Sequence, residues 1–376
     1  MKDLLEIREE IDEIDNEIVR LYEKRMQMVS DVAEYKIATG KKIFDKDREI
    51  QKLDTVSAKA GDDFTKHGVR ELFEQIMSMS RKKQYQLLQQ HGIYDPIEFT
   101  EIEHLKTADA KIIFQGTDGA YSQKALKRFF GAQTENYGVL SWRDAMKYIA
   151  EGRADYAVLP IENSTAGIVS ENYDLLVEYE NYIVGEQILH IQHALMGLPD
   201  ADLDDIKTVY SHPQALSQCS RFLSSHPQWE QHEVNNTAVA AKKVKEEGDR
   251  TQAAIGSIEN ADIYGLKVLQ EGVNYSNTNA TRFIIVAGKP VFVKDSDKIS
   301  ICFEVPNESG SLYHTISHFI YNNLNMTRIE SRPIPERAWE YRFFVDFEGN
   351  FKDSAVQNAL RGLREETRNF RILGNY

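Results

Sequence analysis

The chain of 376 residues is about two and a half times the length of a typical ~150-residue domain, which predicts two or three domains. Hydrophobic residues make up 41% and charged residues 28%, a composition that excludes wholesale disorder and permits more than one core. Lys and Arg total 45 against 59 Asp and Glu, and the formal net charge of -14 argues against binding nucleic acid or an anionic membrane. An anionic ligand therefore requires a local basic pocket.

The cysteines and the N-terminal segment indicate the compartment. Cys219 and Cys302 lie far apart and form no CxxC pair, so we expect neither a disulfide nor a zinc site, and no cofactor. The N-terminus is acidic at once, and no later stretch approaches the ~18 apolar residues that a membrane span needs. The sequence predicts a cytoplasmic protein with reduced cysteines.

Hydrophobic periodicity divides the chain into three regions and a linker. Residues 1–92 contain no proline, and their apolar positions recur at three and four residues, which predicts an all-helical domain. Residues 93–110 include Pro96 and have the polar composition of a linker. Residues 111–290 alternate short Val/Ile/Phe runs with amphipathic segments, which is an α/β pattern. Residues 297–376 follow the order βαββαβ of ferredoxin-like α+β domains, and their last strand is predicted to be short.

The first region begins with a helix that is too long for a small monomer. Apolar residues from Leu4 to Tyr35 fall on the a and d positions of one heptad frame, giving roughly 35 residues and ~50 Å. Arg25 interrupts this seam, and Lys36 lies ~16 Å further along nearly the same face. Because an unpaired guanidinium among apolar side chains is costly, Arg25 requires an anion or dipoles as its partner. We expect this helix to pack on another chain.

Polar residues also mark the next two predicted helices. Ser80 and Gln84 lie at i and i+4 inside an apolar stripe and need hydrogen-bond partners. Asp45 is placed to cap a short helix, with Arg48 and Glu49 on the same face. A solvated helix face is the alternative for these charges. Together, several cations, one carboxylate and two neutral hydrogen-bonding groups point to a small dianion that carries a hydroxyl.

These residues resemble the all-helical class of chorismate mutase. The residues that match the site of this family are Arg8, Arg25, Lys36, Asp45, Arg48, Glu49, Ser80 and Gln84. The resemblance implies that the three arginines hold substrate carboxylates, that Lys36 and Gln84 face the breaking ether bond, and that Glu49 binds the ring hydroxyl. Arg8 lies ~25 Å from Arg25 along one helix, so it can reach the same ligand only from a second chain, as the interlocked dimer of the family also implies. The Claisen rearrangement moves no proton and needs no general base.

In the α/β region the candidate residues lie where predicted strands end. Residues 115–122 carry two glycines, whose backbone N–H groups can approach an anion, although a tight turn explains them equally well. Residues 160–167 and 211–214 bring hydrogen-bonding side chains to strand carboxyl ends, where open α/β sheets bind ligands. Residues 279–283 enter the last strand. Taken singly, Ser211 and Thr281 are each better explained by a turn or a helix cap.

As a set, these segments resemble prephenate dehydratase over about residues 111–287. The matching motifs are Pro160 to Asn163, Ser211 to Gln214 with Gln218 and Cys219, Tyr264 to Leu266, and Thr281 to Phe283. The first loop departs from the family, with Thr117 in place of a proline and Ala120 in place of a threonine. The resemblance implies two α/β lobes with a cleft, like those of a periplasmic solute-binding protein.

The chemistry of this family assigns roles to the matching residues. Prephenate loses carbon dioxide and its ring hydroxyl, so the enzyme must help hydroxide to leave as water. Thr281 is the implied catalytic residue, and because an unperturbed hydroxyl is a poor acid, we expect it to donate a hydrogen bond to the departing hydroxyl. Glu162 or His212 is the candidate proton source. The expected substrate-binding residues are Asn163, Ser164, Thr165, Gln218, Arg282 and Phe283.

The C-terminal region carries two further motifs. Residues 307–312 open a predicted helix and suit a ligand carboxylate, and residues 330–333 end a predicted strand. Both resemble motifs of the ACT regulatory domain, Gly-Ala-Leu and Glu-Ser-Arg-Pro, with Ser311 in place of the alanine. The resemblance implies L-phenylalanine as an allosteric inhibitor, bound by Asn307, Gly310, Ser311, Leu312, Glu330, Ser331, Arg332 and Pro333. A dimerisation module without an effector is the alternative.

The three resemblances follow one another in the order of the bifunctional chorismate mutase/prephenate dehydratase family. This family implies a homodimer or higher homo-oligomer that acts in phenylalanine biosynthesis. Two alternatives stay open: a non-enzymatic phenylalanine sensor, and a chorismate mutase with a silent ligand-binding cleft. The mutase residues and Thr281 argue against the sensor, whereas the altered first loop favours the silent cleft.

Overall fold

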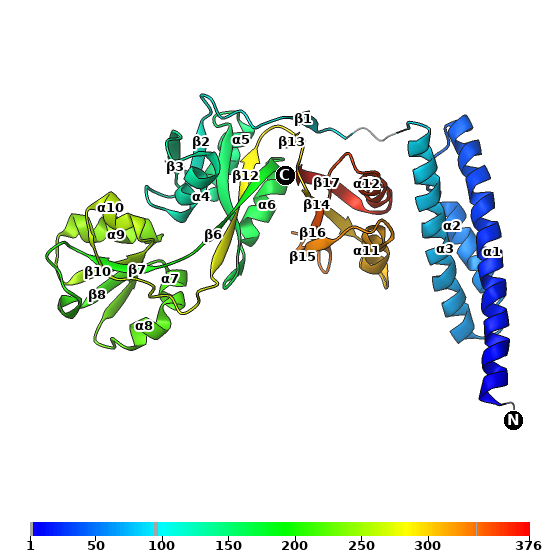
Figure 1. The fold of residues 1–376 in the computed structure, drawn as a ribbon, viewed down its shortest axis with the longest axis horizontal. Helices are drawn as coiled ribbons and strands as arrows, with labels where there is room; N and C mark the ends of the chain where they lie inside the picture. Colours follow the sequence, from blue (N-terminus) through cyan, green and yellow to red (C-terminus); the bar gives the residue numbers. More distant parts are fainter. Residues whose placement is uncertain (1–2, 94–96, 336) are drawn as a thin grey trace. The chain divides into compact units, whose positions relative to one another are not determined.

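The computed structural model describes residues 3–93, 97–335 and 337–376, so Pro96 of the predicted linker lies outside the described residues. The chain divides into two compact units (Figure 1). Residues 1–97, 303–343 and 347–370 form the first unit, and residues 98–302, 344–346 and 371–376 form the second. Among the described residues, no helix has both the length and the apolar character that crossing a membrane requires.

Three helices form the N-terminal part of the first unit: α1 (Leu4–Thr39), α2 (Lys46–Ser57) and α3 (Asp63–Gln90). The 36 residues of α1 confirm the predicted long helix, which ends at Gly40 in the left-handed conformation (φ 66°). The predicted cap of α2 is also confirmed, because Asp45 Oδ1 accepts the backbone N–H of Arg48 at 3.1 Å. Such caps each stabilise a helix by about 1 kcal/mol.

The apolar seam of α1 does not face α3. Within the chain, α1 buries only Met26, Val29 and Ala33 among its described residues. The exposed large apolar residues of α1 include most of the predicted heptad positions: Leu4, Ile7, Ile11, Ile14, Ile18, Leu21, Met28, Val32 and Tyr35. Exposed apolar patches of this extent are typical of protein–protein contact surfaces.

The C-terminal region has the predicted βαββαβ order. Its elements are β14 (Lys298–Val305), α11 (Ser311–Tyr321), β15 (Met326–Pro333), β16 (Tyr341–Glu348), α12 (Ser354–Glu366) and β17 (Arg368–Asn375). The sheet order is β15-β16-β14-β17. The prediction of a short last strand is wrong, because β17 spans eight residues. Pairing extends beyond its apolar run, and Lys298 and Tyr376 exchange both backbone hydrogen bonds.

The two larger sheets of the second unit are separate (Figure 1). The six strands of the first sheet are β2 (Ile112–Gln115), β3 (Asn136–Val139), β4 (Tyr156–Asn163), β5 (Gly167–Ile168), β6 (Tyr182–His190) and β12 (Ala280–Ala287). The five strands of the second are β7 (Ala194–Gly197), β8 (Thr208–Ser211), β9 (Glu230–Glu233), β10 (Gln252–Gly256) and β11 (Lys267–Gln270). This arrangement agrees with the predicted two α/β lobes. The helices of this unit are α4 (Tyr121–Phe130), α5 (Trp142–Ala150), α6 (Ser170–Glu178), α7 (Pro213–Gln218), α8 (Ser220–Ser224), α9 (Thr237–Glu247) and α10 (Glu259–Tyr264).

Two chain segments join these sheets. One runs from β6 to β7 through residues 191–193, and the other runs from β11 to β12 through residues 271–279. Backbone hydrogen bonds connect the two segments, since Ile191 N–H donates to Asn279 O at 2.8 Å and Val273 N–H donates to His193 O at 3.0 Å. The residues around His193 and Asn279 therefore lie at the junction of the sheets.

Part of the predicted linker is ordered in the second unit. β1 (Thr100–Ile102) pairs in parallel with β13 (Val291–Val293). The linker prediction missed this strand because three residues of mixed polarity give no periodic signal.

Strand β12 organises the first sheet. It pairs antiparallel with both β4 and β6, so it has a strand on each side. Its alternate residues enter two different cores, with Ile284 and Val286 in one and Phe283 and Ile285 in the other. Because successive side chains of a strand point to opposite faces, Thr281 and Arg282 also point to opposite faces.

Candidate active sites

A cavity of about 220 Å³ lies where the two sheets of the second unit meet. Its lining residues come from the ends of β2, β4 and β12 and from the segments that follow β8 and β9. The structure brings five of the predicted dehydratase residues into this lining: Asn163, His212, Gln218, Thr281 and Phe283. Ala120, at the position where the first loop departs from the family, also lines the cavity.

Hydrogen bonds fix the orientation of Asn163 and of the Thr281 hydroxyl. Asn163 Oδ1 accepts the backbone N–H groups of Thr165 (3.1 Å) and Ala166 (2.9 Å), so the other side of the amide carries the nitrogen. That nitrogen donates to Thr281 Oγ1 at 2.8 Å. Because Thr281 is the acceptor in this bond, its own proton remains available for an acceptor in the cavity. Thr281 is only 9% exposed, so the surroundings of such a bond are largely free of water.

His212 also reaches the cavity. Its Nδ1 accepts the backbone N–H of Gln214 at 3.2 Å and caps α7. Nδ1 is therefore unprotonated in the neutral ring, which leaves the proton on Nε2. Burial lowers the pKa of His212, while the charge of Glu233 opposes this shift.

The structure does not bring Glu162, Ser164 or Arg282 to the cavity lining. Ser164 accepts the Ala280 N–H at 2.9 Å and donates to Thr278 O at 3.2 Å, so it closes the end of the sheet. Glu162 is the register partner of Arg282 on β4 and shares its face, which is opposite to that of Thr281. The expected roles of Arg282 in orienting substrate and of Glu162 as proton source are therefore corrected by the strand geometry. Thr165 reaches the site through Asn163 and Gln218.

Arg282 belongs instead to a buried ionic network. Its guanidinium donates to Glu186, Asp346 and the Tyr376 hydroxyl, each at 2.7 Å. Burial is the largest influence and lowers the pKa of Arg282, but these three neighbours and their charges raise it overall. Ser300 donates a further hydrogen bond to Asp346. Hydrogen bonds and ion pairs thus connect β12, which carries Thr281, to residues near the ends of β14, β16 and β17.

Replacing Asp346 by alanine is expected to lower the free energy of unfolding by about 3 to 5 kcal/mol, because it leaves a buried guanidinium partly uncompensated. The Asp346 side chain is 5% exposed. Urea unfolding followed by circular dichroism measures the change. Asp63→Ala is the matched control, since the Asp63 carboxylate is 99% exposed in its pair with Lys66 and its loss should cost less than about 1 kcal/mol. Equal free energies of unfolding for the two variants would show that the network does not stabilise the fold as predicted.

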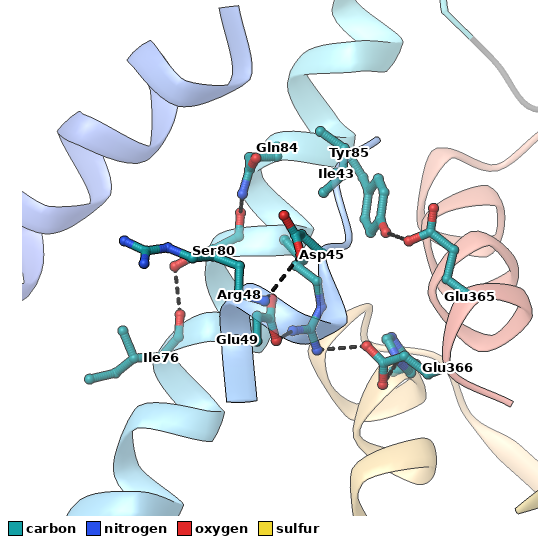
Figure 2. Close-up of polar contacts among 12 residues, drawn as sticks. Ile43, Asp45, Arg48, Glu49, Ile76, Ser80, Gln84, Tyr85, Glu365 and Glu366 are labelled. Atoms are coloured by element: carbon teal, nitrogen blue, oxygen red, sulfur yellow. Dashed lines mark hydrogen bonds and ion pairs between the residues drawn. The ribbon is translucent and has the colours of Figure 1, made fainter. Parts of the chain in front are cut away.

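A second cluster of polar groups lies among the three N-terminal helices (Figure 2). Arg25 donates to Ser80 Oγ, which donates in turn to Ile76 O at 2.6 Å. Gln84 Nε2 donates to Ser80 O at 3.3 Å, and among the described residues Gln84 Oε1 is buried without a partner. Ser80 and Gln84 are buried, as expected for polar groups within an apolar stripe. The cluster therefore offers a half-buried cation beside an unsatisfied amide.

Lys36 and Glu49 complete this cluster. Lys36 Nζ donates to Ile43 O at 2.6 Å. Burial lowers the pKa of Lys36, while the charges of Asp45, Glu49 and Glu365 oppose the shift. Burial also lowers the pKa of Arg25, again against the charge of Glu49. Cations that are partly desolvated in this way gain from binding an anion.

The remaining predicted mutase residues are exposed in the single chain. Arg8 lies in the first turns of α1, and Asp45 and Arg48 lie at the start of α2. Arg8 lies ~25 Å before Arg25 along α1, so a single chain cannot bring both to one small ligand.

The sequence analysis missed Arg81, which is 8% exposed. Arg81 donates to Glu49 and lies 2.6 Å from Glu366 on α12. Tyr85, one turn further along α3, bonds Glu365. Because Arg81 begins the run Arg-Lys-Lys, the pattern reads as a solvated helix face, and only the tertiary structure reveals the burial. Glu49 is thus paired with a protein cation in this structure.

The two C-terminal motifs occupy the predicted elements. Gly310 adopts a positive φ of 82° immediately before α11, a conformation that favours glycine. Residues 330–333 form the end of β15, which is an edge strand of its sheet.

Comparison with known proteins matches both regions of the chain that carry these clusters. A family profile described as chorismate mutase type II matches residues 7–85, and one described as prephenate dehydratase matches residues 112–291. The bifunctional chorismate mutase/prephenate dehydratase of Escherichia coli (strain K12) is 33% identical over 379 residues, covering 99% of this chain and 96% of that protein.

Two solved structures resemble the part of the chain that follows the helices. Prephenate dehydratase from Arthrobacter aurescens in complex with L-Phe has a TM-score of 0.66 and 30% identity, covering 71% of this chain and 89% of its own. GqqA, described as a novel type of quorum quenching acylase, has a TM-score of 0.65 and 30% identity, covering 70% and 96%. The fold and the two sites define an enzyme with separate isomerase and lyase centres. The chain belongs to the family of bifunctional chorismate mutase/prephenate dehydratases.

Proposed function

We propose that the cavity at the junction of the two sheets is the dehydratase site and that Thr281 donates to the departing hydroxyl of prephenate. The observation that carries this proposal is the hydrogen bond from Asn163 to Thr281, which leaves the threonine proton for the ligand. A donor held in place before the reaction stabilises negative charge as the C–O bond breaks. With Glu162 on the other face, His212 is the proposed proton source, because Nε2 is the free side of a ring that lines the cavity. The transfer requires the protonated ring, since a neutral imidazole donates a hydrogen bond but does not give up its proton near neutral pH.

The helical cluster is the proposed mutase site. Arg25 would hold a carboxylate of chorismate, Lys36 and Gln84 would face the ether oxygen, and Glu49 would bind the ring hydroxyl once released from Arg81. Arg8 would enter from a second copy of the chain, as the exposed apolar face of α1 suggests. The proposed assembly is therefore a homodimer whose two mutase sites each use residues of both chains.

The C-terminal βαββαβ region is the proposed ACT domain, with L-phenylalanine as its effector. The complex of the Arthrobacter aurescens dehydratase with L-Phe supports this ligand. The Gly310 turn and the Glu330 to Pro333 strand end are the proposed contacts. The proposed domain limits are 1–92 for the mutase, 111–290 for the dehydratase and 297–376 for the ACT domain.

Supplying the purified protein with chorismate is expected to yield prephenate first and phenylpyruvate second, and saturating L-phenylalanine should lower only the second rate. An effector can act in this way only if it binds one domain arrangement more tightly than another. Chromatography of both products, with and without L-phenylalanine, measures the two rates separately. Prephenate that accumulates without phenylpyruvate would leave a mutase with a silent cleft. Unchanged kinetics in L-phenylalanine would remove the effector assignment.

A further inference from the structure

A continuous set of hydrogen bonds leads from the cavity wall to Thr281, buried at both ends and passing through Thr165, which is exposed. Asn163 Oδ1, whose orientation its backbone donors fix, also accepts the Thr165 hydroxyl at 2.8 Å. With its proton used there, Thr165 Oγ1 acts as the acceptor for Gln218 Nε2 at 2.9 Å. The other end of the Gln218 amide is therefore oxygen, and it lies 3.0 Å from His193 Nε2. The orientation of each group follows from that of its neighbour.

This order determines which nitrogen of His193 carries the proton. An amide oxygen can only accept, so His193 Nε2 must be the donor. His193 is 3% exposed, and burial lowers its pKa, although the Gln218 bond opposes the shift. The ring is therefore neutral, and its Nδ1 is an acceptor that lies 3.1 Å from the Tyr121 hydroxyl. Tyr121 also lies 2.7 Å from Gln192 O, which competes for the same hydroxyl proton.

We propose that His193 is a positioning residue of the dehydratase, which as the neutral Nε2–H tautomer holds Gln218 and thereby keeps the Thr281 proton directed into the cavity. The inference rests on the dehydratase function proposed for this cavity. Each group in this series, from His193 to Asn163, donates to the next group toward Thr281. Hydrogen bonds aligned in this way polarise and strengthen one another. The opposite tautomer would turn the Gln218 amide and draw the Thr165 hydroxyl toward it. Asn163 Oδ1 would then lose two of its donors, the Thr165 hydroxyl at 2.8 Å and Gln218 Nε2 at 3.5 Å. Thr281 would then lose its fixed partner.

Substitution of His193 tests the proposal through the dehydratase rate constants. His193→Leu is expected to lower kcat for prephenate at least about tenfold, because the orientation of the Thr281 donor is lost. A rise in KM is expected to accompany it, because Gln218 and His193 both line the cavity. His193→Gln keeps an N–H donor and is expected to recover part of the loss. His190→Leu is the matched control, since His190 is exposed at the end of β6. Mutase activity should be normal in all three variants.

The tautomer itself supplies a readout that does not depend on catalysis. In the full-length protein with ¹⁵N-labelled histidine, NMR is expected to show His193 neutral and protonated at Nε2 at neutral pH. A ring protonated at Nδ1, or at both nitrogens, would overturn the proposal even if His193→Leu failed to fold. An unaltered kcat in a folded His193→Leu protein would overturn it as well. If the wild-type protein did not turn over prephenate, the function of the cavity would fail while the tautomer result would stand.

Discussion

Thr281→Ala is expected to lower phenylpyruvate formation by about 10²- to 10³-fold while prephenate formation from chorismate continues at the normal rate. The substitution removes the donor that faces the cavity and leaves Asn163 Nδ2 with its remaining acceptors, Asn279 Oδ1 at 2.9 Å and Ala280 O at 3.2 Å. Structural disturbance should therefore be small. The rates of the two reactions are measured on one preparation, so the mutase serves as an internal control for folding.

Two further variants separate the hydroxyl from the surrounding structure. Thr281→Ser keeps the donor and is expected to retain most of the dehydratase activity. Thr278→Ala removes an exposed hydroxyl three residues earlier in the same segment and should leave both activities intact. If Thr281→Ala abolished both reactions together, the idea of separate sites would be wrong. Equal turnover by Thr281→Ala and the wild-type protein would remove Thr281 from the mechanism.

The sequence predicts those elements whose local signals agree with their tertiary environment. The helix from Leu4, the cap at Asp45 and the βαββαβ order each follow from periodicity or turn chemistry, and the structure confirms them. The apolar seam of α1 is a different case. The sequence predicts that it packs on another chain, and within one chain α1 leaves most of the seam exposed and buries a different set of residues. Heptad spacing alone does not identify the surface that covers the seam.

The candidate sites show the same difference between residues that local sequence signals locate and residues whose role depends on the tertiary structure. A pattern of strand ends locates the segments that carry Asn163 and Thr281, and the resemblance to prephenate dehydratase assigns their roles. The face of Arg282 depends on which side of β12 the cavity occupies, and that is a tertiary property. His193 lies in a three-residue segment between strands and carries no pattern of its own. An isolated histidine acquires a role only when its buried neighbours, here Tyr121 and Gln218, are known.

Arg25→Ala is expected to lower chorismate mutase activity by about two to three orders of magnitude without unfolding the protein. The half-buried guanidinium is a strong partner for a substrate carboxylate, because burial has already removed part of its hydration. Its loss leaves Ser80 bonded to Ile76 O at 2.6 Å, so no buried hydroxyl loses its last partner. Arg20→Ala is the matched control on the same helix, since Arg20 is 61% exposed in its pair with Glu17.

Mixing two inactive variants then tests whether each mutase site uses both chains. If Arg8 of one chain serves the site that contains Arg25 of the other, a mixed dimer of Arg8→Ala and Arg25→Ala has one intact site and one site lacking both arginines. Random reassociation of equal amounts is expected to restore about a quarter of wild-type mutase activity. Activity that stays at the level of the separate variants would place Arg8 and Arg25 in the same chain's site and contradict the proposed dimer. Near-normal turnover by Arg25→Ala alone would remove the helical cluster as the site of the rearrangement.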